Sequence, residues 1–146
     1  MVKLILDLIY CFAAAYFYAL LMNAPTSTLI HCSLTASLGY ILYEICTNYG
    51  SPMLGFFLGT TFIASLGEIF ARRHKMPATI FIFPGVIPIV PGLGLYETIL
   101  AFVRDDIFLA LETGVKTFLN IGCMAVAMAM VSLIAIKIKP SAKTNV

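Results

Sequence analysis

Charged residues are scarce in this chain. Only 11% of its 146 residues are Asp, Glu, Lys or Arg, whereas 61% are hydrophobic. A soluble domain has about a quarter charged residues, so the composition excludes an ordinary soluble globular protein. The chain is expected to lie within a membrane, where the distribution of Lys and Arg carries more information than the net charge of +2.

Motifs of catalysis and cofactor binding are also missing. No Gly-rich phosphate loop, no long basic face and no spaced pair of nucleophile and base occur, and His31 and His74 lack a nearby ligand in the sequence. We therefore predict no enzymatic activity, no cofactor, no metal site and no nucleic-acid partner. The four cysteines lie in or beside apolar runs, form no Cys-x-x-Cys pair and are interpreted as small apolar fillers: Cys11, Cys32, Cys46 and Cys123.

Long apolar runs dominate what is present. Runs of about 20 residues are expected to cross a bilayer as helices. The predicted fold is all-α, a single integral membrane domain over residues 1–146 with about five transmembrane segments, the fourth of them broken. These segments cover residues 4–22, 29–46, 53–71, 78–103 and 117–136.

The fourth segment is interrupted between residues 83 and 94, which read Phe-Pro-Gly-Val-Ile-Pro-Ile-Val-Pro-Gly-Leu-Gly. Proline removes a backbone donor and displaces the preceding residue from helical geometry, so no continuous helix is expected here. Broken backbone at membrane depth is tolerated only where protein buries it or where it lines a wet cavity. The stretch therefore predicts a binding site, with a kinked helix packed against its neighbours as the alternative.

Two local patterns predict packing contacts. Gly55 and Gly59 form a small-xxx-small pair that allows close approach of helix backbones. Residues 107–116 form a short amphipathic segment at the membrane interface that leads into the fifth span. Within it, Glu112 and Lys116 stand four apart in the favourable order for an ion pair.

Basic residues give the expected orientation. The residues from Arg72 to Lys75 form one positive cluster, and Lys137, Lys139 and Lys143 form another. The positive-inside rule places both in the cytoplasm of a cell that holds the chain in its plasma or inner membrane. The N-terminus is then outside, with Lys3 as an unexpected external charge, and the break is expected near mid-membrane.

Ionisable residues in the predicted spans are functional candidates, because charges inside a bilayer are costly. Glu68 lies one turn before Arg72 and suits either a simple salt bridge or a protonatable carboxylate at the inner mouth of a pathway. Glu97 follows the break, and burial at mid-membrane would favour its neutral form and make it a proton carrier. Glu44 lies near the end of its span and is expected to reach the outer surface, and Asp7 is interpreted as structural.

The stretch Glu68-Ile-Phe-Ala-Arg-Arg-His-Lys-Met-Pro-Ala-Thr, followed by Pro84-Gly-Val-Ile-Pro-Ile-Val-Pro-Gly and Tyr96, resembles the threonine/serine exporter family. It is similar to the small subunit of split exporters. The resemblance implies export of small carboxylate metabolites, namely threonine and serine or a dicarboxylate such as succinate. It also implies a larger partner subunit that supplies the N-terminal half.

Together these observations define a predicted site. A helix that restarts after the break presents unpaired N–H groups and a positive dipole end, which suit a substrate carboxylate. A non-transporting structural or gating subunit is the alternative function. Expected partners are the larger subunit, the lipid bilayer and, as an option, further copies of the chain. The predicted substrate-binding residues are Pro84, Gly85, Pro88, Pro91, Gly92 and Tyr96, and the predicted proton-coupling residues are Glu68 and Glu97.

Overall fold

The computed structural model describes residues 2–138 of the chain. Helix accounts for 89% of these residues and no strand occurs among them, which confirms the all-α prediction. The elements in order are α1 (Val2–Leu21), α2 (Thr26–Tyr49), α3 (Pro52–His74), α4 (Thr79–Val86), the 3-10 turn η1 (Ile87–Ile89), α5 (Gly92–Val103) and α6 (Ile107–Ile138).

Four helices are long and apolar enough to cross a membrane, and a fifth span results if α4–η1 and α5 count as one broken segment. The two parts of that segment meet at an angle of 59°. The predicted break in the fourth segment is therefore present, and the bent pair fits either a broken span or a re-entrant loop. Residues 107–116 continue directly into the predicted fifth span as one helix of 32 residues, α6.

Helices α1 to α4 form a bundle in which α2 packs against α1, α3 and α4. The predicted Gly55–Gly59 contact is confirmed, since both glycines are buried against α2. A Cβ atom added at Gly59 would lie 3.0 Å from the Tyr43 Cβ and 3.3 Å from the Gly39 carbonyl oxygen. The two backbones therefore approach more closely there than any larger residue allows.

Helix α4 corrects the expected position of the break. Pro84 was expected to end the helix, yet it lies inside α4 and is buried with Gly85. Proline has no N–H to bond the carbonyl four residues earlier, which here belongs to Ile80. The Cys32 thiol of α2 donates to that carbonyl at 3.4 Å, so the freed acceptor is satisfied by a neighbouring helix. The interruption is consequently confined to residues 87–91.

The packing of α4 shows where the break lies along α3. Helix α4 runs antiparallel to α3, with Ile82 against Gly67 and Ile89 against Gly59. The break therefore lies beside the second turn of α3, on the N-terminal side of its middle. Between these two contacts α4–η1 runs beside α3 from Gly67 to Gly59 before the chain bends, and the mid-membrane depth of the break stays a prediction.

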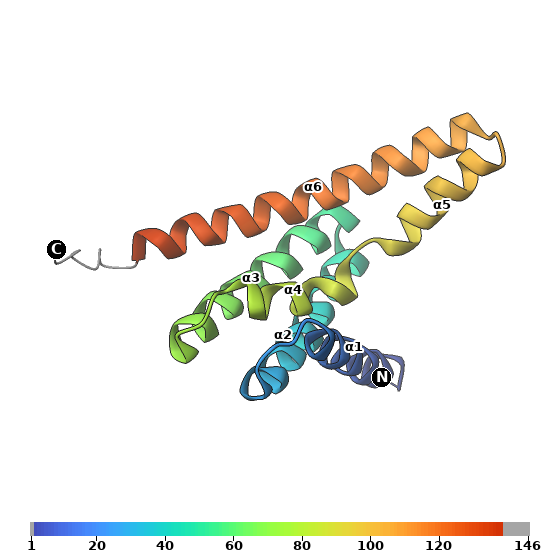
Figure 1. Ribbon diagram of the computed structural model, residues 1–146. Helices are drawn as coiled ribbons and strands as arrows, with labels where there is room; N and C mark the ends of the chain where they lie inside the picture. The colour runs from blue at the N-terminus through green and yellow to red at the C-terminus, as the bar shows by residue number, and fades with distance from the viewer. Residues whose placement is uncertain (1, 139–146) are drawn as a thin grey trace.

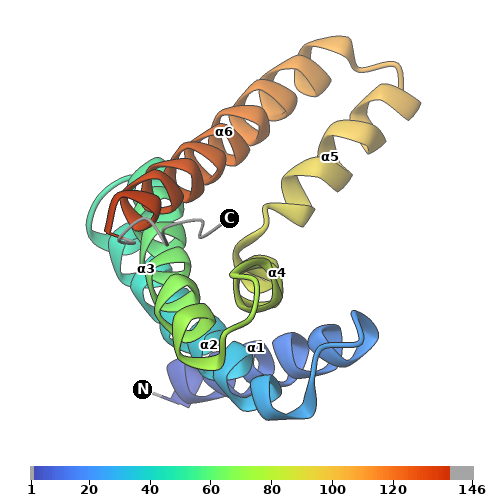
Figure 2. The ribbon, with the colours of Figure 1, turned by 60° about the vertical axis from the view of Figure 1, so that its left-hand side comes forward.

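Helices α5 and α6 form an antiparallel hairpin that projects from the bundle (Figures 1 and 2). Within the described part of the chain, α5 packs against α6 alone, whereas α6 also packs along α3. Met53 and Phe57 of α3 share a groove with α6 residues from Phe118 to Val126. The hairpin, defined as α5 with residues 107–117 of α6, thus extends about 15 Å beyond the start of α3 at 1.5 Å per residue.

The opposite end of α6 returns to the end of α3. The Arg72 Nη2 donates to the Ala135 carbonyl at 2.7 Å. Lys137 therefore stands at the same end of the molecule as the cluster from Arg72 to Lys75, as the orientation argument requires. Lys139 and Lys143 lie outside the described residues.

Candidate functional site

A groove opens directly under the break, where α2, α3, η1, α5 and α6 meet. Its volume is about 410 Å³, within the usual range for a small-molecule site of about 300–1,000 Å³. Three predicted residues line it, namely Pro88, Pro91 and Gly92. Its polar lining comes from other helices and was not foreseen in the sequence: Tyr40, Tyr43, Thr47, Thr117 and Asn120.

The start of α5 supplies free donors to this break groove. The Gly92 N–H bonds the Val90 carbonyl at 2.7 Å and the Leu95 N–H bonds the Pro91 carbonyl at 3.2 Å. Among the described residues, no backbone carbonyl accepts from the N–H groups of Leu93 or Gly94, and no side chain caps the helix. Two open donors and a positive helix end can hold an anionic oxygen.

The other predicted substrate-binding residues lie away from the groove. Pro84 and Gly85 are buried in the bundle, and a Cβ atom at Gly85 would lie 2.7 Å from the Ile63 Cγ2. Their role in the fold is close packing of α4. Tyr96 is on α5 with 61% of its surface exposed and is not among the groove-lining residues.

Glu68 lines a second pocket of about 660 Å³, between the ends of α3 and α6 and the start of α4. We call it the mouth pocket; Arg72 and Lys75 line it with Glu68, and Ala135 and Ile136 form its α6 wall. The alternative of a Glu68–Arg72 salt bridge is not realised. Among the described residues Glu68 makes no ion pair, and Arg72 donates to Ala135 instead.

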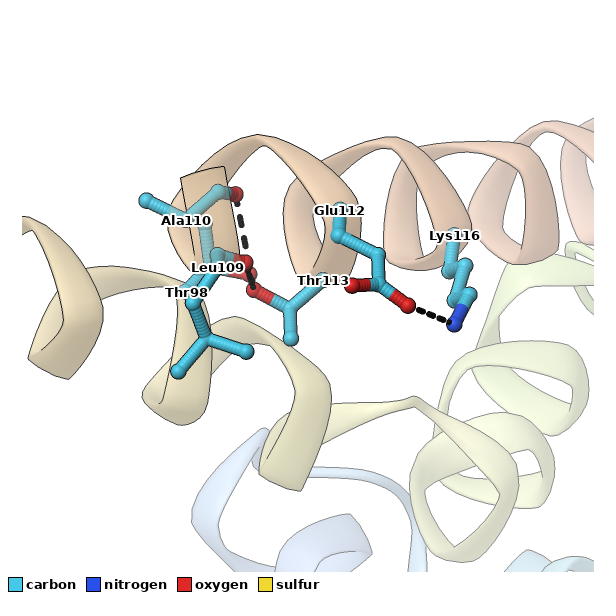
Figure 3. A network of polar contacts seen from close by, with 6 residues as sticks. All are labelled: Thr98, Leu109, Ala110, Glu112, Thr113 and Lys116. Carbon is cyan, nitrogen blue, oxygen red and sulfur yellow. Dashed lines mark hydrogen bonds and ion pairs between the residues drawn. The ribbon is translucent and has the colours of Figure 1, made fainter. Parts of the chain in front are cut away.

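Glu97 lines a third pocket of about 540 Å³ in the hairpin, with Arg104 and Asp106. The Glu97 side chain is not covered by other parts of the described chain. Nearby, the Thr98 Oγ1 donates to the Thr113 Oγ1 at 3.2 Å and ties α5 to α6 (Figure 3). The predicted pair of Glu112 and Lys116 forms at 2.6 Å.

Two polar clusters were missed because they join distant helices. The Lys3 Nζ contacts the Glu44 Oε1 at 2.9 Å, so Glu44 pairs with α1 and its side chain is only 17% exposed. Asp7 lies one turn after Lys3 on α1. His31 and His74 also meet, with ring centroids 4.7 Å apart. In the sequence, the one available indication of these two contacts is that both partners lie near the ends of helices that meet.

Comparison with known proteins gives a consistent result. The family described as Threonine/Serine exporter, ThrE, matches residues 7–134. An uncharacterized protein of Haemophilus influenzae is 25% identical over 96% of this chain and 50% of its own length. A threonine/serine exporter of Corynebacterium glutamicum is 30% identical over 77% of this chain and 21% of its own length. The chain thus spans half or less of these relatives, and no solved structure matches it.

Proposed function

We propose that this chain, which belongs to the threonine/serine exporter family, is a membrane subunit of a secondary exporter for small carboxylate metabolites. The candidate substrates are threonine and serine or a dicarboxylate such as succinate. One observation carries the proposal: the uncapped start of α5 faces a groove of about 410 Å³ inside a multi-pass membrane protein. Broken helices in transporters present their ends to substrate in this way.

In the proposed mechanism, substrate reaches the break groove from the end of the bundle that carries Arg72 to Lys75. Its carboxylate accepts hydrogen bonds from the N–H groups of Leu93 and Gly94, where the helix dipole favours negative charge. The hydroxyls and the amide of Tyr43, Thr117 and Asn120 are placed to bond the polar remainder of the substrate. No charged side chain lines the groove among the described residues, so the backbone is the source of positive potential there.

Proton coupling is assigned to Glu68 or Glu97. The two carboxylates lie in separate pockets on either side of the break groove, so a proton could bind before or after the substrate passes. Export driven by a proton gradient should lose its dependence on that gradient in Glu68→Gln or in Glu97→Gln. If export by both variants depends on the proton gradient as strongly as export by the wild type, neither residue is the coupling carboxylate.

The break groove is tested by Gly92→Val with Gly122→Val as its matched control. A Cβ at either position meets no atom within 4 Å in the described structure, so the two positions are matched in the space around the first added atom. Only Gly92 lies in the groove, where the added side chain obstructs the Leu93 and Gly94 donors. Gly92→Val should lower export of labelled L-threonine, L-serine or succinate from vesicles about tenfold, which corresponds to about 1.4 kcal/mol. Export at the control rate, with equal amounts of protein in the membrane, would contradict the assignment.

A larger partner subunit completes the proposal. The support is that the chain spans 50% of the length of its Haemophilus influenzae relative, and that large apolar side chains of the hairpin are uncovered. Export should therefore require a second protein that co-purifies with the chain. If that protein exports substrate equally well with the Gly92→Val chain, the chain acts as the structural or gating subunit instead.

A further inference from the structure

The mouth pocket carries a charge arrangement that the break groove lacks. Glu68, Arg72 and Lys75 follow one another at positions i, i+4 and i+7 on α3, and all three line the same pocket. At 1.5 Å per residue, Arg72 lies about 6 Å and Lys75 about 10 Å beyond Glu68 along the helix. The carboxylate is therefore the inner charge and the two cations are the outer charges.

The three charges are held apart rather than neutralised against each other. The Arg72 Nη2 bond to the Ala135 carbonyl at 2.7 Å fixes the guanidinium against α6. Its other N–H donors remain for an anionic ligand. Lys75 ends α3 in the left-handed conformation, with φ 55°, which turns the chain around the rim of the pocket. Glu68 has no ion-pair partner among the described residues.

We propose that the mouth pocket is a second binding site, distinct from the break groove, for a small zwitterion whose ammonium and carboxylate share one carbon. The ammonium bonds Glu68, and the carboxylate bonds Arg72 and Lys75. Its role as the first station of an export path rests on the proposed function. Its occupancy can be measured by binding, without transport, once the break groove is obstructed by Gly92→Val.

The arrangement discriminates between the candidate substrates. A zwitterion places opposite charges on Glu68 and on the two cations. A dicarboxylate bound to Arg72 and Lys75 brings its second carboxylate towards Glu68, and like charges at short range oppose binding. The mouth pocket therefore selects an α-amino acid over succinate, whereas the break groove, with its backbone donors, accepts any carboxylate.

The first experiment compares two glutamate variants of the full chain, each carrying Gly92→Val so that the break groove does not contribute to binding. The proteins are purified in phosphatidylglycerol nanodiscs with any protein that co-purifies. Glu68→Gln keeps the shape and removes the charge, and Glu112→Gln is the matched control on the far side of the molecule. Equilibrium binding of labelled L-threonine should weaken about tenfold in Glu68→Gln and stay unchanged in the control, while binding of succinate should strengthen or stay constant. Equal loss of both ligands, or loss of neither, would overturn the proposal.

The second experiment changes the ligand, so that it holds even if a variant folds poorly. 3-Hydroxybutyrate is L-threonine without its ammonium. It should bind the wild type about tenfold more weakly than L-threonine, and both should bind Glu68→Gln alike, as a double-mutant cycle requires for a direct contact. Threonine amide, which lacks the carboxylate, should lose affinity in the wild type but not in Lys75→Gln. If either cycle shows no coupling energy, the corresponding contact, of Glu68 with the ammonium or of Lys75 with the carboxylate, is refuted.

A zwitterionic lipid head group has the same pairing of ammonium and anion, so the discs are also made with phosphatidylethanolamine. L-Threonine affinity independent of this lipid identifies the free amino acid as the ligand, and competition by the lipid would overturn that assignment.

The assignments of the two sites can be refuted independently of each other. Gly92→Val should lower export about tenfold while L-threonine still binds the mouth pocket. Normal export in Gly92→Val, with binding lost in Glu68→Gln, would contradict the break groove as a site and leave the mouth pocket in place.

Discussion

The bundle of α1 to α4 and the hairpin of α5 with residues 107–117 are built on different rules. In the bundle, glycines and small polar residues let backbones meet, and α4 is enclosed by α2 and α3. In the hairpin, α5 has one neighbour and its large apolar side chains face outwards, such as Ile99 and Val103. The difference shows that several helices within the chain hold α4 in place, whereas α5 depends on α6 alone for its packing.

The largest expected effect tests the close packing of the bundle. Gly59→Val places a branched side chain against the Tyr43 Cβ at 3.0 Å and the Gly39 carbonyl at 3.3 Å, and neither backbone can retreat. Such overpacking should cost about 3 kcal/mol. The melting temperature of the purified chain measures it, and Gly122→Val, which meets nothing within 4 Å, is the control. Equal melting temperatures would mean that the α2–α3 contact is not close.

A smaller effect is expected where the hairpin closes on itself. A Cβ at Gly94 would clash with the Thr117 Oγ1. Gly94→Ala should therefore destabilise the hairpin by about 1–2 kcal/mol, and Thr117→Ala in the same chain should restore most of that loss. Hydrogen exchange of the α5 amides is the measurement, because the bundle should keep its protection. Loss of protection in both regions would show that they unfold together.

Arg72 links the bundle to α6, and its loss should be milder. Arg72→Met removes the bond to the Ala135 carbonyl, which is partly exposed, so a cost of about 1 kcal/mol is expected. Exchange should rise in the last turns of α6 and not at the start of α5. Arg72→Lys serves as the control for charge. An unchanged exchange rate at Ala135 would contradict the link.

The smallest effect on stability is expected on the hairpin surface. Phe108 is 90% exposed, so Phe108→Ala should leave the melting temperature of the isolated chain unchanged. If a partner covers the hairpin, the amount of co-purified protein should fall. Leu54→Ala, at an exposed position on α3, is the comparison. If the amount of co-purified protein falls in both variants, the partner does not recognise the hairpin specifically. If it falls in neither, the exposed face of the hairpin contacts lipid and not a partner.

The sequence was sufficient for the helices and for the existence of the break, because length, hydropathy and prolines are local signals. It was insufficient for the extent of the break. Pro84 lies inside α4, and the Ile80 carbonyl that it leaves without a backbone donor accepts from Cys32, which lies 48 residues before Ile80 in the sequence. No local pattern carries that information. The register between α3 and α4 was not predicted for a related reason, since spacing along the chain does not determine it.

The candidate site was foreseen in part. The restart of a helix at Gly92 follows from the Pro-Gly sequence, and the groove forms there. Its side-chain lining comes from Tyr43 on α2 and Asn120 on α6, which no motif marks. Glu68 and Glu97 stood out as charges in apolar surroundings, but the structure puts them in two separate pockets. Which charges share a pocket depends on tertiary packing.

The length of α6 sets a further condition on the membrane that holds this chain. Its 32 residues extend about 48 Å, whereas the hydrocarbon core of a bilayer is about 30 Å thick. A helix so much longer than the core must tilt, or leave one end outside the hydrocarbon, and either response depends on lipid chain length. Because α5 moves with the start of α6, bilayer thickness acts on the angle at the break. Thinner and thicker bilayers should therefore favour different openings of the break groove.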